Sequence, residues 1–270
     1  MTPIVLVGLQ LIGIVAIVLA AWFAGKKLLG YPWSALGWGV LAFPLSQVFR
    51  FLLIYPVNML WGAIFDAHTA LIATTLTLIA TSGLFEETTR WVVMRFWAKR
   101  TRAWRDGVGF GLGHGGIEAL ITIGSVSINN IVLLLAADQI LEAVESQQNP
   151  EAIEAVNQQI DAVHNITAAL VSMSLYERIL AITLHVAMSV LVLRAVRERR
   201  WVLWLAAVAI HIAFNSIAVG MMQLGPAAMY SALTVSTLAL LWALLKGPLS
   251  RKAVETQPSG TPADHLSSPV

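Results

Sequence analysis

The sequence predicts an all-α fold, a polytopic membrane bundle of about seven transmembrane helices. Three observations support this prediction. The 270 residues are 57% hydrophobic and only 12% charged, with a mean hydropathy of +0.74, whereas soluble domains usually carry about 25% charged residues. Seven apolar runs approach or exceed the length of about 20 residues that a helix needs to cross a bilayer. The basic residues gather in alternate links between these runs.

The apolar runs define the expected helices. They cover residues 3–24, 33–55, 69–98, 107–135, 166–193, 201–222 and 227–245. The third and fourth runs are longer than one crossing requires, so we expect tilted or interrupted helices there. We expect one transmembrane domain over residues 1–246, with an acidic outer loop at 136–165 that folds as a short helical hairpin broken at Asn149-Pro150.

The distribution of charge predicts the topology. Lys and Arg follow the first, third, fifth and seventh runs, whereas the links at 56–68, 136–165 and 223–226 contain neither. The positive-inside rule then places the N-terminus outside and the C-terminus in the cytoplasm. The first run lacks a preceding basic region, so we expect a retained span rather than a signal peptide. Residues 247–270, rich in Ser, Thr and Pro, are expected to form a disordered cytoplasmic tail.

Composition also limits the functional classes. The chain contains no cysteine, which excludes disulfides, thiolate chemistry and cysteine-based zinc sites. The net charge of +2 comes from basic residues in the links and gives no indication of nucleic-acid binding. We expect a multi-pass protein of the cell membrane whose partner is the lipid bilayer.

The third run contains an ionisable cluster, Glu86, Glu87 and Arg90. Each such group costs about 2.5–3.5 kcal/mol at the centre of a bilayer-spanning helix, so an intramembrane cluster indicates a functional site. Both carboxylates lie three or four residues before Arg90, which places all three groups on one helical face. One carboxylate can therefore be held charged by the guanidinium.

Three other spans carry polar side chains, and these are His114 with Glu118, His185, and His211 with Asn215. Both pairs are spaced i,i+4 and share a helical face. At 1.5 Å of rise per residue, each position lies roughly 10–15 Å from the cytoplasmic end of its span. The common depth predicts one buried, water-accessible site in the inner half of the bilayer.

These residues resemble the clan of CAAX-processing and bacteriocin-processing (CPBP, Abi) and PrsW-like intramembrane proteases, and within it the YhfC family. The clan pattern is a Glu-Glu pair followed by Arg, then FxxxH, then HxxxN or HxxxD. Here the matches are Glu86-Glu87 with Arg90, Phe110 to His114, and His211 to Asn215. The spacing EExxR is nearer to the PrsW-like form than to the EExxxR of the CAAX-processing branch.

The resemblance implies an intramembrane endopeptidase of the glutamate type that cleaves membrane-associated or membrane-embedded substrates near the cytoplasmic leaflet. Glu86, assisted by His114, would activate a water, His211 and Asn215 would stabilise the oxyanion, and Glu87 with Arg90 would orient the site. Glu118 and His185 are supporting residues. No cofactor is expected in this mechanism.

Alternatives stay open at this point. A zinc-dependent peptidase would use His114, His185 and His211 as ligands, although the chain has no HExxH motif. A proton-coupled transporter or a binding or immunity protein without proteolysis would also use intramembrane carboxylates and histidines. Arg50 is interpreted as a snorkelling residue or a partner of Asp66. Glu177 and Arg178 are interpreted as structural, paired with Asn129 or Asn130.

Overall fold

The structure is a computed structural model that describes residues 1–146 and 148–256, which form α-helices, one π-helical turn and short links. Seven helical segments are long and apolar enough to cross a membrane, which confirms the predicted fold class. The helices are α1 (Pro3–Leu29), α2 (Trp33–Ile64), α3 (Ala67–Val92), the π-helix η1 (Val93–Trp97), α4 (Trp104–Glu145), α5 (Pro150–His164), α6 (Ala168–Glu198), α7 (Trp201–Met222), α8 (Pro226–Leu245) and α9 (Arg251–Glu255).

Local sequence signals explain the helix ends. Gly30 ends α1 in the left-handed conformation, with φ of 67°, which glycine adopts without steric cost. The Asp66 side chain caps α3 by accepting hydrogen bonds from the backbone N–H groups of His68 and Thr69. Pro226 occupies the first turn of α8, where its missing N–H would have no helical partner.

The two longest apolar runs are interrupted, as the sequence predicts. The third run changes from α-helix to π-helix at Val93. The fourth run forms α4, which has a non-helical residue at Ala136, with φ of −131° and ψ of 26°. Beyond this kink α4 continues to Glu145, and α5 begins at Pro150. These two segments form the helical hairpin expected around Asn149-Pro150.

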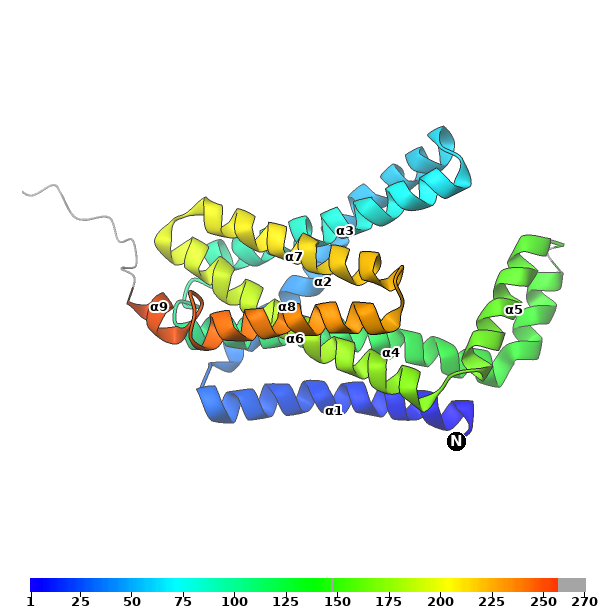
Figure 1. Ribbon diagram of the computed structural model, residues 1–270, viewed down its shortest axis with the longest axis horizontal. Helices are drawn as coiled ribbons and strands as arrows, with labels where there is room; N and C mark the ends of the chain where they lie inside the picture. The colour runs from blue at the N-terminus through cyan, green and yellow to red at the C-terminus, as the bar shows by residue number, and fades with distance from the viewer. Residues whose placement is uncertain (147, 257–270) are drawn as a thin grey trace, which may run out of the picture.

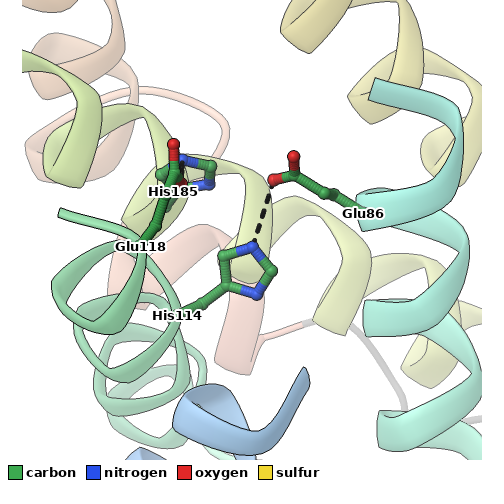
Figure 2. Close-up of side chains that lie close together, drawn as sticks. All are labelled: Glu86, His114, Glu118 and His185. Atoms are coloured by element: carbon green, nitrogen blue, oxygen red, sulfur yellow. Dashed lines mark hydrogen bonds and ion pairs between the residues drawn. The ribbon is translucent and has the colours of Figure 1, made fainter. Parts of the chain in front are cut away.

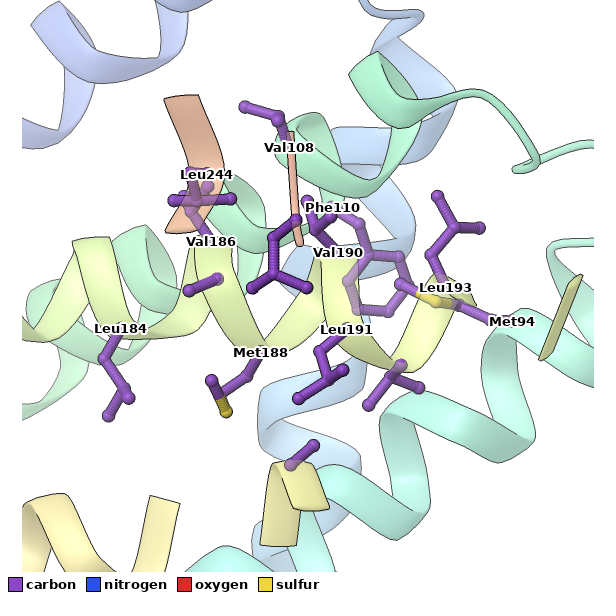
Figure 3. Close-up of a cluster of buried hydrophobic side chains, with 14 of the residues drawn as sticks. Met94, Val108, Phe110, Leu184, Val186, Met188, Val190, Leu191, Leu193 and Leu244 are labelled. Atoms are coloured by element: carbon purple, nitrogen blue, oxygen red, sulfur yellow. The ribbon is translucent and has the colours of Figure 1, made fainter. Parts of the chain in front are cut away.

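Helix α6 lies at the centre of the bundle (Figure 1). In its most apolar window 83% of the residues are buried, whereas the corresponding windows of the other spans are 11–28% buried. The core around α6 includes Leu184, Met188 and Leu193 together with Met94 and Phe110 from neighbouring helices (Figure 3). Exposed apolar side chains cover the outer surface of the bundle. In a bilayer these side chains contact lipid, so the helices are held together by close packing and polar contacts.

Glycines allow α4 to pack between α2 and α6. A Cβ atom on Gly111 would lie 2.4 Å from Val186 Cα of α6, and one on Gly113 would lie 2.1 Å from the Leu36 carbonyl oxygen of α2. Real Cβ contacts are never this short, so only glycine permits the observed backbone separation. The close packing fixes the helix that carries His114 and Glu118.

The links with basic residues lie at one end of the bundle, and the acidic hairpin lies at the other (Figure 1). This alternation agrees with the charge pattern, and the orientation of the termini in the membrane stays a prediction. The expectation of disorder from Gly247 onward is wrong for residues 247–256. These residues include the helix α9. The side chains of Leu249 and Val254 are buried, and the Trp104 indole N–H donates to the Leu249 carbonyl over 2.8 Å. The rest of the expected tail, 257–270, lies outside the described residues.

Candidate functional site

Four helices bring the predicted polar residues into one buried cluster. Helix α3 contributes the Glu-Glu-Arg motif, α4 contributes His114 and Glu118, α6 contributes His185, and α7 contributes His211 and Asn215. The exposed fraction is 3% or less for six of these residues, namely Glu86, Glu87, Arg90, His114, His185 and His211. Each of the three histidines lies about three helical turns from the end of its span that carries the basic links.

The crossing of α3 and α7 depends on Gly83. A Cβ atom there would lie 3.1 Å from the Val208 carbonyl oxygen and 2.7 Å from a side-chain atom of Ile212. The absence of a side chain therefore lets the two helices approach closely just before Glu86. This approach places His211 beside the two carboxylates.

Glu87 and Arg90 form a fully buried ion pair. Arg90 Nη1 donates to both oxygens of Glu87, over 2.8 and 2.7 Å, and both side chains have 0% exposure. Arg90 Nη2 lies 3.1 Å from His185 Nδ1. Because a guanidinium has only donors, this nitrogen of His185 must be the acceptor. A neutral His185 therefore carries its proton on Nε2.

Glu87 also contacts His211, whose Nδ1 lies 2.8 Å from Glu87 Oε1. The other nitrogen, His211 Nε2, lies 4.0 Å from Glu86 Oε2 and 3.5 Å from Ser82 Oγ. A carboxylate beside one ring nitrogen fixes the tautomer of the imidazole, because the proton stays on the nitrogen that faces the acceptor. Neutral His211 therefore presents a lone pair toward Glu86. The oxyanion role implied by the resemblance would need the doubly protonated ring.

The two oxygens of Glu86 have different surroundings. Oε1 accepts from Ser82 Oγ over 3.1 Å and from Gln47 Nε2 over 3.4 Å. Oε2 lies 3.2 Å from His114 Nε2. Asn215 Nδ2 donates to Ser82 Oγ over 3.1 Å, so the amide of Asn215 reaches Glu86 only through the serine. The carboxylate and the imidazole of His114 thus form the direct acid–base pair of the site.

Glu118 lies on the opposite side of the cluster from Glu86 (Figure 2). Its Oε2 contacts His185 Nε2, and its Oε1 lies 3.8 Å from Arg178 Nη1. Because neutral His185 carries its proton on Nε2, this contact pairs the imidazole N–H with the carboxylate in the metal-free protein.

Four side chains converge closely enough to hold a metal ion. Glu86, His114, Glu118 and His185 each offer one ligand atom, and these atoms all lie within 4.8 Å of one another. Figure 2 shows the four side chains pointing toward a common centre. Imidazole nitrogens and carboxylate oxygens are the ligands of catalytic zinc sites that lack cysteine. The donor set therefore fits a zinc ion.

Sequence analysis missed two polar residues that contact Glu86, namely Ser82 and Gln47. Ser82 stands four residues before Glu86 on the same face of α3, and this spacing is a signal that was available. Gln47 is an amide inside the otherwise apolar run 33–55. Its position beside Glu86 depends on the packing of α2 against α3, which the sequence does not encode locally.

Two pairings expected for arginines are wrong, whereas the snorkelling of Arg50 and a structural role for Arg178 stay predictions. Arg50 does not pair with Asp66, because its guanidinium donates to Thr81, Leu78 and Gln47. Arg178 does not contact Asn129 or Asn130 in the described contacts, because its guanidinium faces Glu177, Glu118 and Thr122. Both arginines therefore belong to networks that end at site carboxylates.

Comparisons with known proteins agree with this arrangement of residues. A family model described as YhfC intramembrane metalloprotease matches residues 11–239. The uncharacterized membrane protein YhfC of Bacillus subtilis (strain 168) is 36% identical over 143 residues, which cover 51% of this chain and 53% of that protein. The chain thus matches about half the length of this curated relative. No solved structure matches the chain.

The family description bears on the expected mechanism. It names a metalloprotease, which supports an intramembrane protease in general and does not support the cofactor-free, glutamate-type mechanism. Placement in the wider clan stays a prediction. With seven candidate spans and a family match over most of its length, the chain is a multi-pass membrane protein that belongs to the YhfC intramembrane metalloprotease family.

Proposed function

We propose that this protein is a metal-dependent intramembrane peptidase that hydrolyses peptide bonds of membrane-embedded or membrane-associated substrates. The observation that carries the proposal is the convergence of Glu86, His114, Glu118 and His185 on one buried centre, with ligand atoms within 4.8 Å of one another. The description of the family supports it.

His114, His185 and Glu118 would hold the ion, because two histidines and one glutamate are a common zinc set that leaves one position open. When bound, zinc acts as a Lewis acid toward a peptide carbonyl and lowers the pKa of a water molecule. In the metal-free protein Arg90 faces His185 Nδ1, so for Nε2 to hold the ion the proton of neutral His185 would have to move to Nδ1, with loss of the Arg90 contact.

Glu86 would then act as the general base. Its Oε1 is fixed by Ser82 and Gln47, whereas its Oε2 faces the side of the site where His114 lies. Hydrolysis requires one group that takes a proton from water and returns it to the leaving amine. A carboxylate with one fixed oxygen and one free to exchange a proton satisfies that requirement. Glu87 and Arg90 keep His211 and the helix α3 in place around it.

A cavity of about 500 Å³ between α3 and α7 supports access from within the membrane. It is lined mainly by apolar side chains, and its inner end is formed by Ile79 and Ser216. Ser216 directly follows Asn215, and Ile79 lies three residues before Ser82. A membrane-embedded peptide in this cavity would therefore reach the Ser82–Asn215 contact next to Glu86. Cleavage near the cytoplasmic leaflet is part of the same proposal.

A glutamate-type peptidase is the second candidate, and one observation favours it. His114 Nε2 and Glu86 Oε2 lie 3.2 Å apart, so they can exchange a proton directly in the absence of a metal ion. In that mechanism Glu86 and His114 activate the water together. The same two residues are essential in both candidates, and only the metal dependence separates them.

The test compares new peptide termini in membranes that contain the wild-type protein, Glu86→Ala or His114→Ala. His164→Ala is the matched control, because His164 is exposed on α5. Cleavage products should disappear with the first two variants and persist with the control. A chelator should abolish cleavage by purified protein, and zinc should restore it. Cleavage that resists the chelator would support the glutamate-type mechanism, and cleavage by both site variants would refute either peptidase.

A further inference from the structure

Arg50 lies half-buried within the membrane span α2, and all its described polar contacts are with neighbouring protein groups. Its Nη2 donates to the Leu78 carbonyl over 2.7 Å, and its Nε lies 3.3 Å from Thr81 Oγ1. Its Nη1 donates to Gln47 Oε1 over 3.0 Å. An arginine within a membrane is costly and usually marks a function. Here the guanidinium joins α2 to α3 one turn before the site.

The contact with Arg50 fixes the orientation of the Gln47 amide. A guanidinium has donors only, so the amide oxygen must face Arg50. The amide nitrogen then faces the other way, where it donates to Ser46 Oγ over 3.1 Å and to Glu86 Oε1 over 3.4 Å. The reversed amide would place its oxygen against a carboxylate and its N–H groups against a guanidinium. Both contacts would be repulsive, so Arg50 selects one orientation.

The Gln47 amide in turn helps to orient Glu86. Glu86 Oε1 takes hydrogen bonds from Gln47 and Ser82, which leaves Oε2 as the oxygen that faces His114. Without the amide, only the serine hydroxyl would restrain Oε1. Ser82 Oγ is also within 3.5 Å of His211 Nε2, so its single proton can be diverted to the imidazole. Of the two donors to Glu86 Oε1, Gln47 is therefore the one whose direction is fixed by another residue, Arg50.

We propose that Arg50, acting through Gln47, is a positioning residue that holds the Glu86 carboxylate with Oε2 directed at the reacting centre. The proposal rests on the proposed role of Glu86 in hydrolysis. Neither residue belongs to the three sequence motifs of the site, and α2 contributes no other side chain that contacts Glu86 in the described contacts. The site thus extends over five helices rather than four.

The first experiment measures the carboxylate directly and needs neither metal nor substrate. An infrared difference spectrum between the metal-free wild type and Glu86→Gln identifies the stretching band of Glu86. The same band is then recorded in Gln47→Met, which has a side chain of similar length, adds no charge and removes the donor. It is also recorded in Arg50→Gln. The band should shift in both variants, because the number of hydrogen bonds to Oε1 changes.

Gln10→Leu is the matched control for loss of a buried membrane amide. Gln10 is bonded to Ser174 and Ser127 and has no described contact with the site. Its removal should leave the Glu86 band unchanged. An unchanged band in Gln47→Met and Arg50→Gln would overturn the proposal, and an equal shift in Gln10→Leu would show a general structural effect instead.

The second experiment separates positioning from binding. With a cleavable substrate, Gln47→Met should lower kcat about tenfold, the size expected for one charge-assisted hydrogen bond, and leave KM unchanged. Gln10→Leu should keep the wild-type kcat. A rise in KM alone would contradict positioning of the base. If the wild type cleaves nothing while the infrared band still shifts, the proposed function fails and the positioning of Glu86 stands.

Discussion

His211 Nδ1 lies 2.8 Å from Glu87 Oε1, and the same carboxylate receives two hydrogen bonds from Arg90. The ion pair keeps Glu87 an acceptor, so the His211 proton stays on Nδ1 and the lone pair of Nε2 points toward Glu86. Glu87 therefore fixes the tautomer of His211, whereas Glu86 is the proposed general base. Adjacent positions on α3 serve different roles because their neighbours differ.

The tautomer of His211 gives the first prediction, which concerns Glu87→Gln. Arg90 can only donate, so the new amide would present its oxygen to Arg90 and its NH₂ group to His211. The histidine proton would then move to Nε2. We expect kcat to fall about 10–100-fold, the usual effect of losing the partner that orients a histidine. The turnover of a cleavable substrate measures this loss.

The matched control for this prediction is Glu198→Gln. Glu198 is also a glutamate paired with arginine in a membrane span, but its described partners, Arg194 and Arg200, have no described contact with the site. We expect its kcat to stay within about twofold of the wild type, since exposed or peripheral pairs contribute little. An equal loss in both variants would assign the effect to general loss of charge.

The buried ion pair gives the second prediction, which concerns stability. Arg90→Met removes the cation paired with Glu87 at 0% exposure and leaves only the His211 contact on this carboxylate. We expect a loss of about 3–5 kcal/mol in the free energy of unfolding, because the remaining buried charge has lost its ion-pair partner. The double variant Arg90→Met with Glu87→Gln removes that charge and should recover part of the loss. Unfolding in mixed detergent micelles measures both.

Metal binding gives the third prediction, which separates the proposed ligands from the neighbouring histidine. Glu118→Ala and His185→Ala should each weaken zinc binding by more than about tenfold, because even loss of a residue that only supports a ligand costs 10–100-fold. His211→Ala should keep the metal and lose turnover. Metal content after dialysis and zinc titration of the metal-free protein are the measurements. Retention of zinc by His185→Ala together with its loss from His211→Ala would reassign the ligands.

Much of the fold follows from the sequence because the bilayer imposes simple constraints. Every backbone polar group in hydrocarbon must be paired within the helix, so long apolar runs identify the spans and their order. The helices of the structure extend beyond the predicted runs, because apolar and weakly polar residues remain helical past the hydrocarbon. Helix α2, for example, continues to Ile64. The order found at Leu249 and Val254 depends on contacts with distant residues such as Trp104.

The part of the site that could be predicted is the part where the sequence motifs lie at the same depth in their spans. Glu86, His114 and His211 share a level on separate helices, and the sequence predicts their proximity from helix rise alone. The contacts of Gln47 and Arg50 could not be predicted in this way. Their role depends on which face of α2 packs against α3, and a span with lipid on most sides has no amphipathic pattern that reveals that face.

Helix packing gives the last prediction, which links a glycine to the site. Gly111→Ala would place a Cβ atom 2.4 Å from Val186 Cα and 2.7 Å from the His185 carbonyl oxygen. Backbone atoms cannot move aside as a flexible side chain can, so α4 and α6 must separate. We expect a loss of about 3 kcal/mol or more in unfolding free energy. The shift would also displace His185, so zinc binding should weaken in the same variant.

Gly124→Ala is the matched control on the same helix. A Cβ atom at this position meets no heavy atom within 4 Å. Alanine is the better helix former by about 0.5–1 kcal/mol, so this variant should be as stable as the wild type or more stable, with unchanged zinc affinity. Thermal unfolding in detergent and zinc titration measure both effects. Equal stability of the two variants would contradict the prediction. It would show that the distance between α4 and α6 at Gly111 is larger than in the structure, and that the glycine contact does not hold His185.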